Sequence, residues 1–269
     1  MIKIENTQFY SLEAAIRGMR NPMNSWEKSD SDYCDCCCWV LNDTDQAEQC
    51  RFGRIEVVGE DECVFCDCDF LIGPNDHALM MKLAKAGPVH AKYRRMITVS
   101  CDITAPLYWW KEFDTYKIGT VANSCSTMHK IAEKEFTVDD FSHEHLFEWE
   151  EALSNDGMDC AFTLSTISDE KYIAVSECIL SDTITALNYY REKYNETHDK
   201  RYWWQMIQLL PTSYNQRRTV QMNFEVLAHI YPDRINHKLD EWHEFCQWIE
   251  ALPYSEFVTL KTAEGQKED

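Results

Sequence analysis

The sequence predicts a mixed fold in which helices outnumber strands, and three observations support this expectation. Gly and Pro number only 8 and 7 in 269 residues, and such scarcity disfavours the many tight turns of a barrel or sandwich. Hydrophobic residues make up 45% of the chain and charged residues 27%, as in ordinary globular proteins. Most apolar stretches repeat at helical spacing, whereas one alternates between apolar and polar residues. The length permits one large domain or two small ones, and either can bury a core.

Helices are expected where apolar residues recur at intervals of three and four. They cover residues 11–22, 76–86, 106–116, 139–154, 182–197, 200–209, 214–230 and 236–251. Ser11 is the expected N-terminal cap of the first helix, and Pro22 ends it. Gly87 ends the second, and Pro106 stands in the first turn of the third, where proline is tolerated. The last helix carries an apolar stripe that we assign to the core, formed by Leu239, Trp242, Phe245, Cys246 and Ile249.

One strand and several irregular segments complete the expected organisation. Residues 95–104 predict a strand, because alternate positions form one apolar face of Ile97, Val99, Cys101 and Ile103. A Cys-rich segment covers residues 27–70, with a loop expected over 27–50 and a hairpin over 54–70 that turns at residues 59–61. The polar tail, residues 262–269, is expected to fray.

The net charge of −20 disfavours nucleic acids and anionic membranes as partners, because like charges repel at long range. No run approaches the ~18 apolar residues of a membrane span. Residues 1–6 are charged and lack the apolar core of a signal peptide. We therefore expect a cytoplasmic protein that binds neither nucleic acid nor membrane. The scarcity of Gly also leaves no Gly-rich phosphate loop.

Thirteen cysteines allow two interpretations. In a reducing compartment the default is free thiols. The alternative is a metal site, since two clusters about 30 residues apart contain C-x-C and C-x-x-C spacings that suit a four-thiolate site. The candidate ligands are Cys34, Cys36, Cys63 and Cys66.

Residues 109–130 run from an aromatic helix into a segment rich in hydroxyl and amide side chains. Asn123, Ser124 and Ser126 offer donors and acceptors that suit a polar ligand such as a nucleotide. The alternative is a structural loop whose Ser and Thr side chains satisfy its own backbone. Cys125 is a further, weaker candidate as a nucleophilic thiolate, with His129 as a base supplied by folding.

Two groups of basic residues stand out in this acidic chain. The larger comprises Arg217, Arg218, Arg234, His237 and Lys238. Arginine suits bidentate contacts to phosphate, but these residues also fit a solvated helix face paired with Glu225, Asp233 or Asp240. The smaller group, His90, Lys92, Arg94 and Arg95, fits either an anion-binding edge or an exposed turn.

The order of these features resembles the flavin-dependent thymidylate synthases. A strand ending in Ala105-Pro106 is followed by a helix and a polar segment, and Leu210-Pro211 lies twelve residues before Asn223, which lies eleven before Arg234. The resemblance covers about residues 79–130 and 202–250, with a fainter echo near residues 16–25. It implies a single α/β (α+β) domain over residues 1–269, with a small, mostly antiparallel sheet packed with helices, assembled as a homotetramer.

The signature of that family, R-H-R-x7-S-x-R-Y, is altered here. Thr115-Tyr116-Lys117 stands in place of R-H-R, and eight residues rather than seven precede Ser126. Ile207 and Glu225 stand where the family has arginines that contact substrate phosphate and flavin. Since each charge-assisted arginine contact contributes about 1.5–3 kcal/mol, these losses weaken anion binding unless other groups substitute.

What the resemblance implies about the site is nevertheless specific. It assigns flavin (FAD) contacts to Lys117, Asn223, His90 and His229. It assigns a pyrimidine nucleotide, dUMP in the family, to Ser126 and Arg234, and we add Asn123, Ser124 and Arg217 on chemical grounds. The catalytic residues stay undefined, because the flavin rather than a protein nucleophile delivers the hydride.

Three functions therefore remain open. The first is FAD-dependent methylation of dUMP to dTMP with methylenetetrahydrofolate and NADPH, or a related reaction on another pyrimidine nucleotide. The second is a non-catalytic nucleotide-binding or regulatory protein that kept the scaffold and lost FAD. The third is a metal-binding interaction protein that uses the cysteine clusters.

Overall fold

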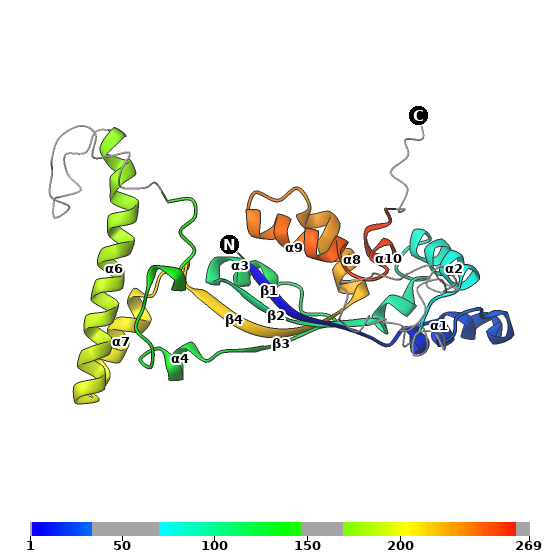
Figure 1. Cartoon of the computed structure of the whole chain (residues 1–269), viewed down its shortest axis with the longest axis horizontal. Helices are drawn as coiled ribbons and strands as arrows, with labels where there is room; N and C mark the ends of the chain where they lie inside the picture. The colour runs from blue at the N-terminus through cyan, green and yellow to red at the C-terminus, as the bar shows by residue number, and fades with distance from the viewer. Residues whose placement is uncertain (1, 34–69, 147–168, 262–269) are drawn as a thin grey trace, which may run out of the picture.

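The computed structural model describes residues 2–33, 70–146 and 169–261 (Figure 1). In chain order the helices and strands are β1 (Lys3–Tyr10), α1 (Leu12–Arg20), η1 (Asn21–Met23), η2 (Trp26–Lys28), α2 (Pro74–Lys85), η5 (Lys92–Arg95), β2 (Thr98–Pro106), α3 (Leu107–Phe113), β3 (Thr120–Ser124), α4 (Thr127–Lys130), η6 (Val138–Asp140), α6 (Asp169–Thr197), α7 (Lys200–Leu209), β4 (Asn215–Asn223), α8 (Phe224–Arg234), α9 (Asp240–Glu250) and α10 (Glu256–Thr259).

The four strands form one antiparallel sheet in the order β1-β2-β4-β3. Helices α3, α8, α9 and α10 lie over one face, and no described helix covers the other face (Figure 1). This confirms the expected fold class, a small antiparallel sheet packed with helices. No described helix combines the length and hydropathy that a membrane span requires.

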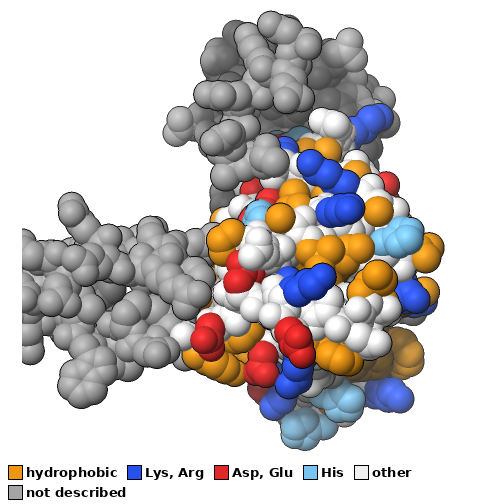
Figure 2. Space-filling model, turned by 90° about the vertical axis from the view of Figure 1, so that its right-hand side faces the viewer, with side chains coloured by type: hydrophobic (Ala, Val, Ile, Leu, Met, Phe, Trp, Pro, Cys, Tyr) orange, Lys and Arg blue, Asp and Glu red, His pale blue; other side chains and the backbone are white. Residues whose placement is uncertain are grey.

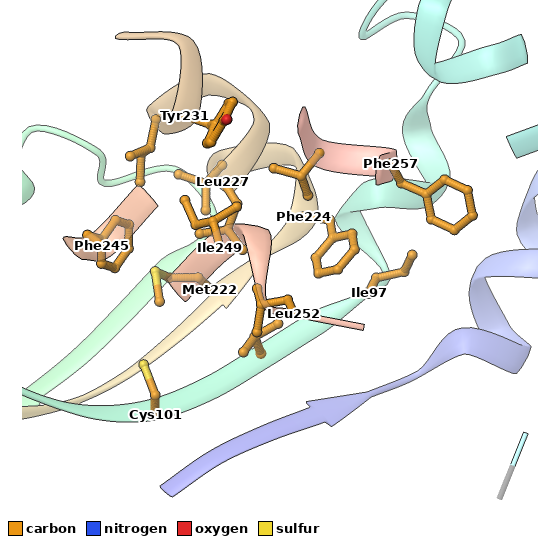
Figure 3. Close-up of a cluster of buried hydrophobic side chains, with 14 of the residues drawn as sticks. Ile97, Cys101, Met222, Phe224, Leu227, Tyr231, Phe245, Ile249, Leu252 and Phe257 are labelled. Atoms are coloured by element: carbon orange, nitrogen blue, oxygen red, sulfur yellow. The ribbon is translucent and has the colours of Figure 1, made fainter. Parts of the chain in front are cut away.

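The main core lies between the sheet and the helices that cover it. Alternate residues of β2 enter this core, as the predicted pattern requires. Figure 3 shows how side chains from β2, β4, α8, α9 and α10 meet there. The predicted apolar stripe of α9 is confirmed, since Trp242, Phe245, Cys246 and Ile249 are fully buried and Leu239 packs against them. Burial raises the pKa of the Cys246 thiol to about 11 and that of Cys101 to about 12. Neither forms a disulfide with another cysteine in the described ranges.

A second, smaller core lies at the far end of the sheet, where the long helix α6 stands beside α7 (Figure 1). Its buried members include Phe136, Phe141, Leu187 and Met206. Asn188 joins α6 to the segment that follows α4. Its side chain accepts a hydrogen bond from Phe136 N and donates one to Phe136 O, both at 2.9 Å. The prediction of a helix over 182–197 is thus confirmed, although α6 begins at Asp169.

Three predictions about elements were wrong. Residues 214–230 form strand β4 followed by α8 rather than one helix, because β4 pairs on both sides, with β2 and β3. Within 139–154 the described part holds η6 and an isolated bridge from Phe141 to Tyr214 rather than a helix, and residues 147–154 lie outside the described ranges. Ser11 precedes α1 with a left-handed φ of 75° and its side chain makes no capping hydrogen bond.

Other boundaries moved less. The predicted strand begins at Thr98 because Lys92–Arg95 form η5. Strand β1 was not predicted. The polar segment expected as a loop contains strand β3. The predicted hairpin and most of the predicted loop lie in residues 34–69, outside the described part.

A buried ion pair joins α1 to α2. Arg20 Nε donates to Asp76 Oδ1 over 2.6 Å, and the two side chains are 5% and 0% exposed. Ser29 and Ser31 hydroxyls donate to the other oxygen of Asp76, each over 2.6 Å. The burial of Asp76 raises its pKa, but hydrogen bonds from Ser29, Ser31 and Arg20 outweigh this effect and leave the pKa below its ordinary value.

Replacing Asp76 by Asn is expected to cost about 3–5 kcal/mol of unfolding free energy, because Arg20 becomes an uncompensated buried charge. Urea denaturation measures the loss. Glu196→Gln, which removes the exposed partner of Lys193, is the matched control and is expected to cost no more than about 0.5 kcal/mol.

The same pair makes stability depend on pH. Because the folded state lowers the pKa of Asp76 from 3.8, the contribution is complete above that value and is lost as pH falls through the lower folded pKa. The difference in urea midpoint between wild type and Asp76→Asn should therefore stay constant down to about pH 5 and narrow from there to about pH 2. A difference that stays constant between about pH 5 and about pH 2 would contradict the assignment.

Candidate functional site

Asp102 organises the face of the sheet that no described helix covers, which we call the open face. Its carboxylate accepts hydrogen bonds from Thr219 Oγ1 at 2.6 Å, Arg217 Nη2 at 2.8 Å and Asn6 Nδ2 at 2.8 Å. These donors, Thr219 first, hold the pKa of Asp102 well below its ordinary range. The side chain of Arg217, a predicted ligand residue, is therefore held on this face by an ionised carboxylate while remaining 48% exposed.

Strand β3 carries two predicted ligand residues, Asn123 and Ser124, at the edge of the sheet. Asn123 pairs in register with Thr219, and Ser124 pairs with Arg218. Both β3 side chains are exposed, and the backbone nitrogen of Cys125 donates to Arg217 O over 2.9 Å. Asn123 and Arg217 thus point to the open face, whereas Ser124, opposite Arg218, points to the other face.

Ser126 lies just beyond β3 and has a structural partner. Its hydroxyl caps α4 by accepting from His129 N at 3.2 Å and lies 2.8 Å from His129 Nδ1. His129 thus contacts Ser126 in this arrangement, although it was suggested as a base for Cys125. Cys125 is exposed and forms no disulfide with another described cysteine.

Arg234 lies on the opposite side of the sheet, among the covering helices. Its Nη1 donates to Glu112 Oε2 over 2.6 Å, and its Nε donates to Tyr116 Oη over 2.8 Å. The guanidinium carbon stands 4.5 Å from the ring centroid of Trp242 and 5.4 Å from that of Tyr116. Glu112 and Trp242 were not predicted as members of a site, since no local sequence signal marks a contact between residues so far apart.

Lys117 and Asn223 flank a tight turn at Gly119. The backbone of Gly119 has φ +86°, and a side chain there would come within 2.7 Å of the Asn223 amide nitrogen. Asn223 caps α8 by accepting from Val226 N at 3.0 Å and donates its own backbone N–H to Gly119 O. Lys117 is exposed and has no ion-pair partner among the described residues. Of the predicted flavin contacts, these two are neighbours.

The other two predicted flavin contacts lie beside acidic or apolar groups. His229 Nε2 is 3.6 Å from Glu225 Oε1, and Arg95 Nη2 is 3.9 Å from the same oxygen. Glu225 is only 6% exposed. His90 is exposed near Val89 and Lys92 at the end of the molecule that also carries α1 and α2. Figure 2 shows basic and apolar side chains interspersed on this end.

The smaller basic group is neither a simple turn nor an open anion site. Lys92 and Arg95 are exposed, whereas Arg94 is 5% exposed, and its Nε and Nη2 have no hydrogen-bond partner within the described part of the chain. In the larger group, Arg217 and Arg218 lie on a strand rather than on the expected helix face. Arg218 pairs with Asp114 at 2.7 Å and stacks over Trp110. Ile207, in the position of a family arginine, packs in the second core.

The predicted ligand residues therefore do not form a single group. Asn123 and Arg217 lie on the open face, Lys117 and Asn223 lie around the turn at Gly119 before β3, and Arg234 lies among the covering helices. Lys117 and Ser126 are also separated by strand β3, whose five residues span about 17 Å. A single chain does not bring all of them into one pocket.

The cysteine candidates Cys34, Cys36, Cys63 and Cys66 lie outside the described residues. The described residues on the two sides of that segment lie next to each other, because Asp32 and Leu71 form an antiparallel bridge. Among the described residues no group of His, Cys, Asp and Glu side chains is arranged to hold a metal ion. The metal site stays a prediction.

The fold is that of the flavin-dependent thymidylate synthases. Two structures of thymidylate synthase X (ThyX) from Helicobacter pylori, both with FAD and dUMP, match with TM-scores of 0.54 and 0.53 at 16% identity. They cover 96% and 95% of this chain and 96% of the other chain in each case. A UMP/dUMP methylase, PolB from Streptomyces cacaoi with 5-Br dUMP, matches with a TM-score of 0.53 at 13% identity over 97% of this chain and 95% of its own. No protein-family model and no curated protein sequence matches the chain.

The turn at Gly119 provides a test of this corner. Gly119→Ala should destabilise the protein by about 1 kcal/mol more than Gly87→Ala. Both glycines have positive φ, but a side chain at Gly87 meets nothing within 4 Å, whereas one at Gly119 displaces the Asn223 cap. Thermal unfolding of the two variants measures the difference, and equal losses would contradict a capping role for Asn223.

Proposed function

We propose that this chain is a pyrimidine-nucleotide-binding protein on a ThyX-like scaffold, and that it works without FAD. The observation that carries the proposal is that three structures matching it over almost the whole of both chains are described with dUMP or 5-Br dUMP. The shared ligand class is thus a pyrimidine nucleotide. FAD is named for the two ThyX structures but not in the description of PolB.

The chemistry of the open face supports a polar ligand of this class. Asn123 offers an amide that both donates and accepts, as the edge of a pyrimidine ring requires. Arg217 supplies positive charge beside this amide, although Asp102 shares that charge. One nucleotide would contact both this group and the group around Lys117 only if two copies of the chain each contributed one. The homotetramer implied by the family resemblance would provide such a shared site.

The residues present do not fit FAD. The pyrophosphate of FAD is anionic, yet the arginines of this region are paired with carboxylates: Arg95 with Glu225, Arg217 with Asp102, Arg218 with Asp114, and Arg234 with Glu112. His229, a predicted flavin contact, lies against the buried carboxylate of Glu225, which would repel a phosphate. We therefore derive no step through flavin, NADPH or methylenetetrahydrofolate, and favour the non-catalytic binding or regulatory function.

The purified full-length protein tests this proposal by calorimetric titration with dUMP, UMP and FAD. We expect dUMP or UMP to bind, and FAD neither to bind nor to raise the melting temperature. A flavin absorbance spectrum in the protein as purified, or tight binding of added FAD, would overturn the exclusion of FAD. Absence of binding by both nucleotides would overturn the function.

Arg217→Gln should weaken nucleotide binding about tenfold, because one charge-assisted contact is lost. Arg201→Gln is the matched control. Arg201 is also an exposed arginine paired with an aspartate, Asp199, but it lies on α7, away from the open face. Equal affinities in the two variants would show that Arg217 takes no part in binding.

A further inference from the structure

Two N–H groups donate to a single oxygen of Glu112, and a ring nitrogen of His237 lies close to the same oxygen. Glu112 Oε2 accepts from Arg234 Nη1 at 2.6 Å and from Trp242 Nε1 at 2.9 Å, and it lies 3.4 Å from His237 Nε2. The three nitrogens come from three places, the end of α8, the α8–α9 connection and α9, whereas the carboxylate comes from α3. A charged arginine with a further N–H donor around one oxygen is the arrangement that proteins use to bind phosphate and carboxylate ligands.

The arginine in this arrangement is held in place by aromatic rings as well as by Glu112. Trp242 and Tyr116 flank the guanidinium at 4.5 and 5.4 Å, and Tyr116 accepts from its Nε. These contacts do not require a charge on residue 112. The Arg234 side chain is 16% exposed and Glu112 is 35% exposed, so the carboxylate can be reached from solvent.

We propose that Glu112 is a specificity-determining residue that fills an anion site with the chain's own carboxylate and so excludes phosphate from Arg234. The inference rests on the proposed function, because it treats the excluded anion as the phosphate of the nucleotide. It also explains why Arg234, a predicted substrate residue, is paired internally. In the wild-type protein the phosphate has to be met by other cations, such as Lys117, which is exposed and has no ion-pair partner among the described residues.

Inorganic phosphate tests the inference without any nucleotide. Calorimetric titration should show that Glu112→Gln binds phosphate at least about tenfold more tightly than wild type, because Arg234 regains an unneutralised charge. The double variant E112Q/R234Q should return to the wild-type affinity. Glu133→Gln, which removes the exposed carboxylate paired with Lys130, should leave phosphate binding unchanged.

Either of two results in the phosphate titrations of Glu112→Gln and the double variant would overturn the inference. One is an unchanged phosphate affinity in Glu112→Gln, and the other is a gain that persists in the double variant. Circular dichroism shows whether each variant is folded. If Glu112→Gln fails to fold, Glu112→Asp replaces it, because the shorter side chain withdraws the carboxylate from Arg234 while keeping its charge. A smaller gain in phosphate affinity is then expected, and no gain would overturn the inference.

Parallel titrations with dUMP and deoxyuridine separate this inference from the proposed function. Glu112→Gln should increase the preference for dUMP over deoxyuridine about tenfold. If wild type and variant bind neither compound but the variant gains phosphate affinity, the proposed function fails and the exclusion of phosphate by Glu112 stands. If both bind dUMP with an unchanged preference over deoxyuridine, the proposed function stands and the role of Glu112 fails.

Discussion

The pairing of β2 with β4 is the interaction on which the rest of the structure depends. The register runs without interruption from Thr98 opposite Asn223 to Pro106 opposite Asn215. Because side chains alternate along a strand, this register sends Cys101 and Val220 into the core and places Asp102 beside Thr219 on the open face. A shift of one residue would bury the Asp102 network and expose the core. The core and the candidate binding face are thus fixed by the same hydrogen bonds.

Local neutralisation of arginines is the second recurring feature. A chain with a net charge of −20 repels anions at long range. Around the sheet, carboxylates also pair directly with the arginines. Burial decides how much each pair matters. Arg20 and Asp76 are almost fully buried, so their pair is a structural clamp. The pair of Arg217 and Asp102 is partly solvated and leaves the arginine accessible to a ligand.

Local patterns in the sequence predicted most of the helices, because their apolar stripes match what the core buries. They failed within residues 139–146, which hold η6 and an isolated bridge. They also failed for β4, whose polar sequence takes its conformation from two neighbouring strands rather than from its own residues. The spacing from Asn223 to Arg234 has a simple structural meaning, since Asn223 caps α8 and Arg234 is its last residue. It therefore reports the length of a helix. The partners of Arg234 stayed hidden, because Glu112 and Arg234 are 122 positions apart and no spacing rule connects them.

The filled anion site changes how the affinity for a ligand has to be understood. A solvated, mobile arginine loses hydration and conformational freedom when it binds phosphate. In this chain Glu112 and two aromatic rings already order Arg234, so the loss of its hydration and conformational freedom occurs during folding. What remains is an exchange of one anion for another. The affinity for phosphate then depends on the difference between two charge-assisted contacts rather than on the strength of either. Since Glu112 is tethered in place, its effective concentration is high, and the protein can keep a well-ordered arginine while binding free anions weakly there.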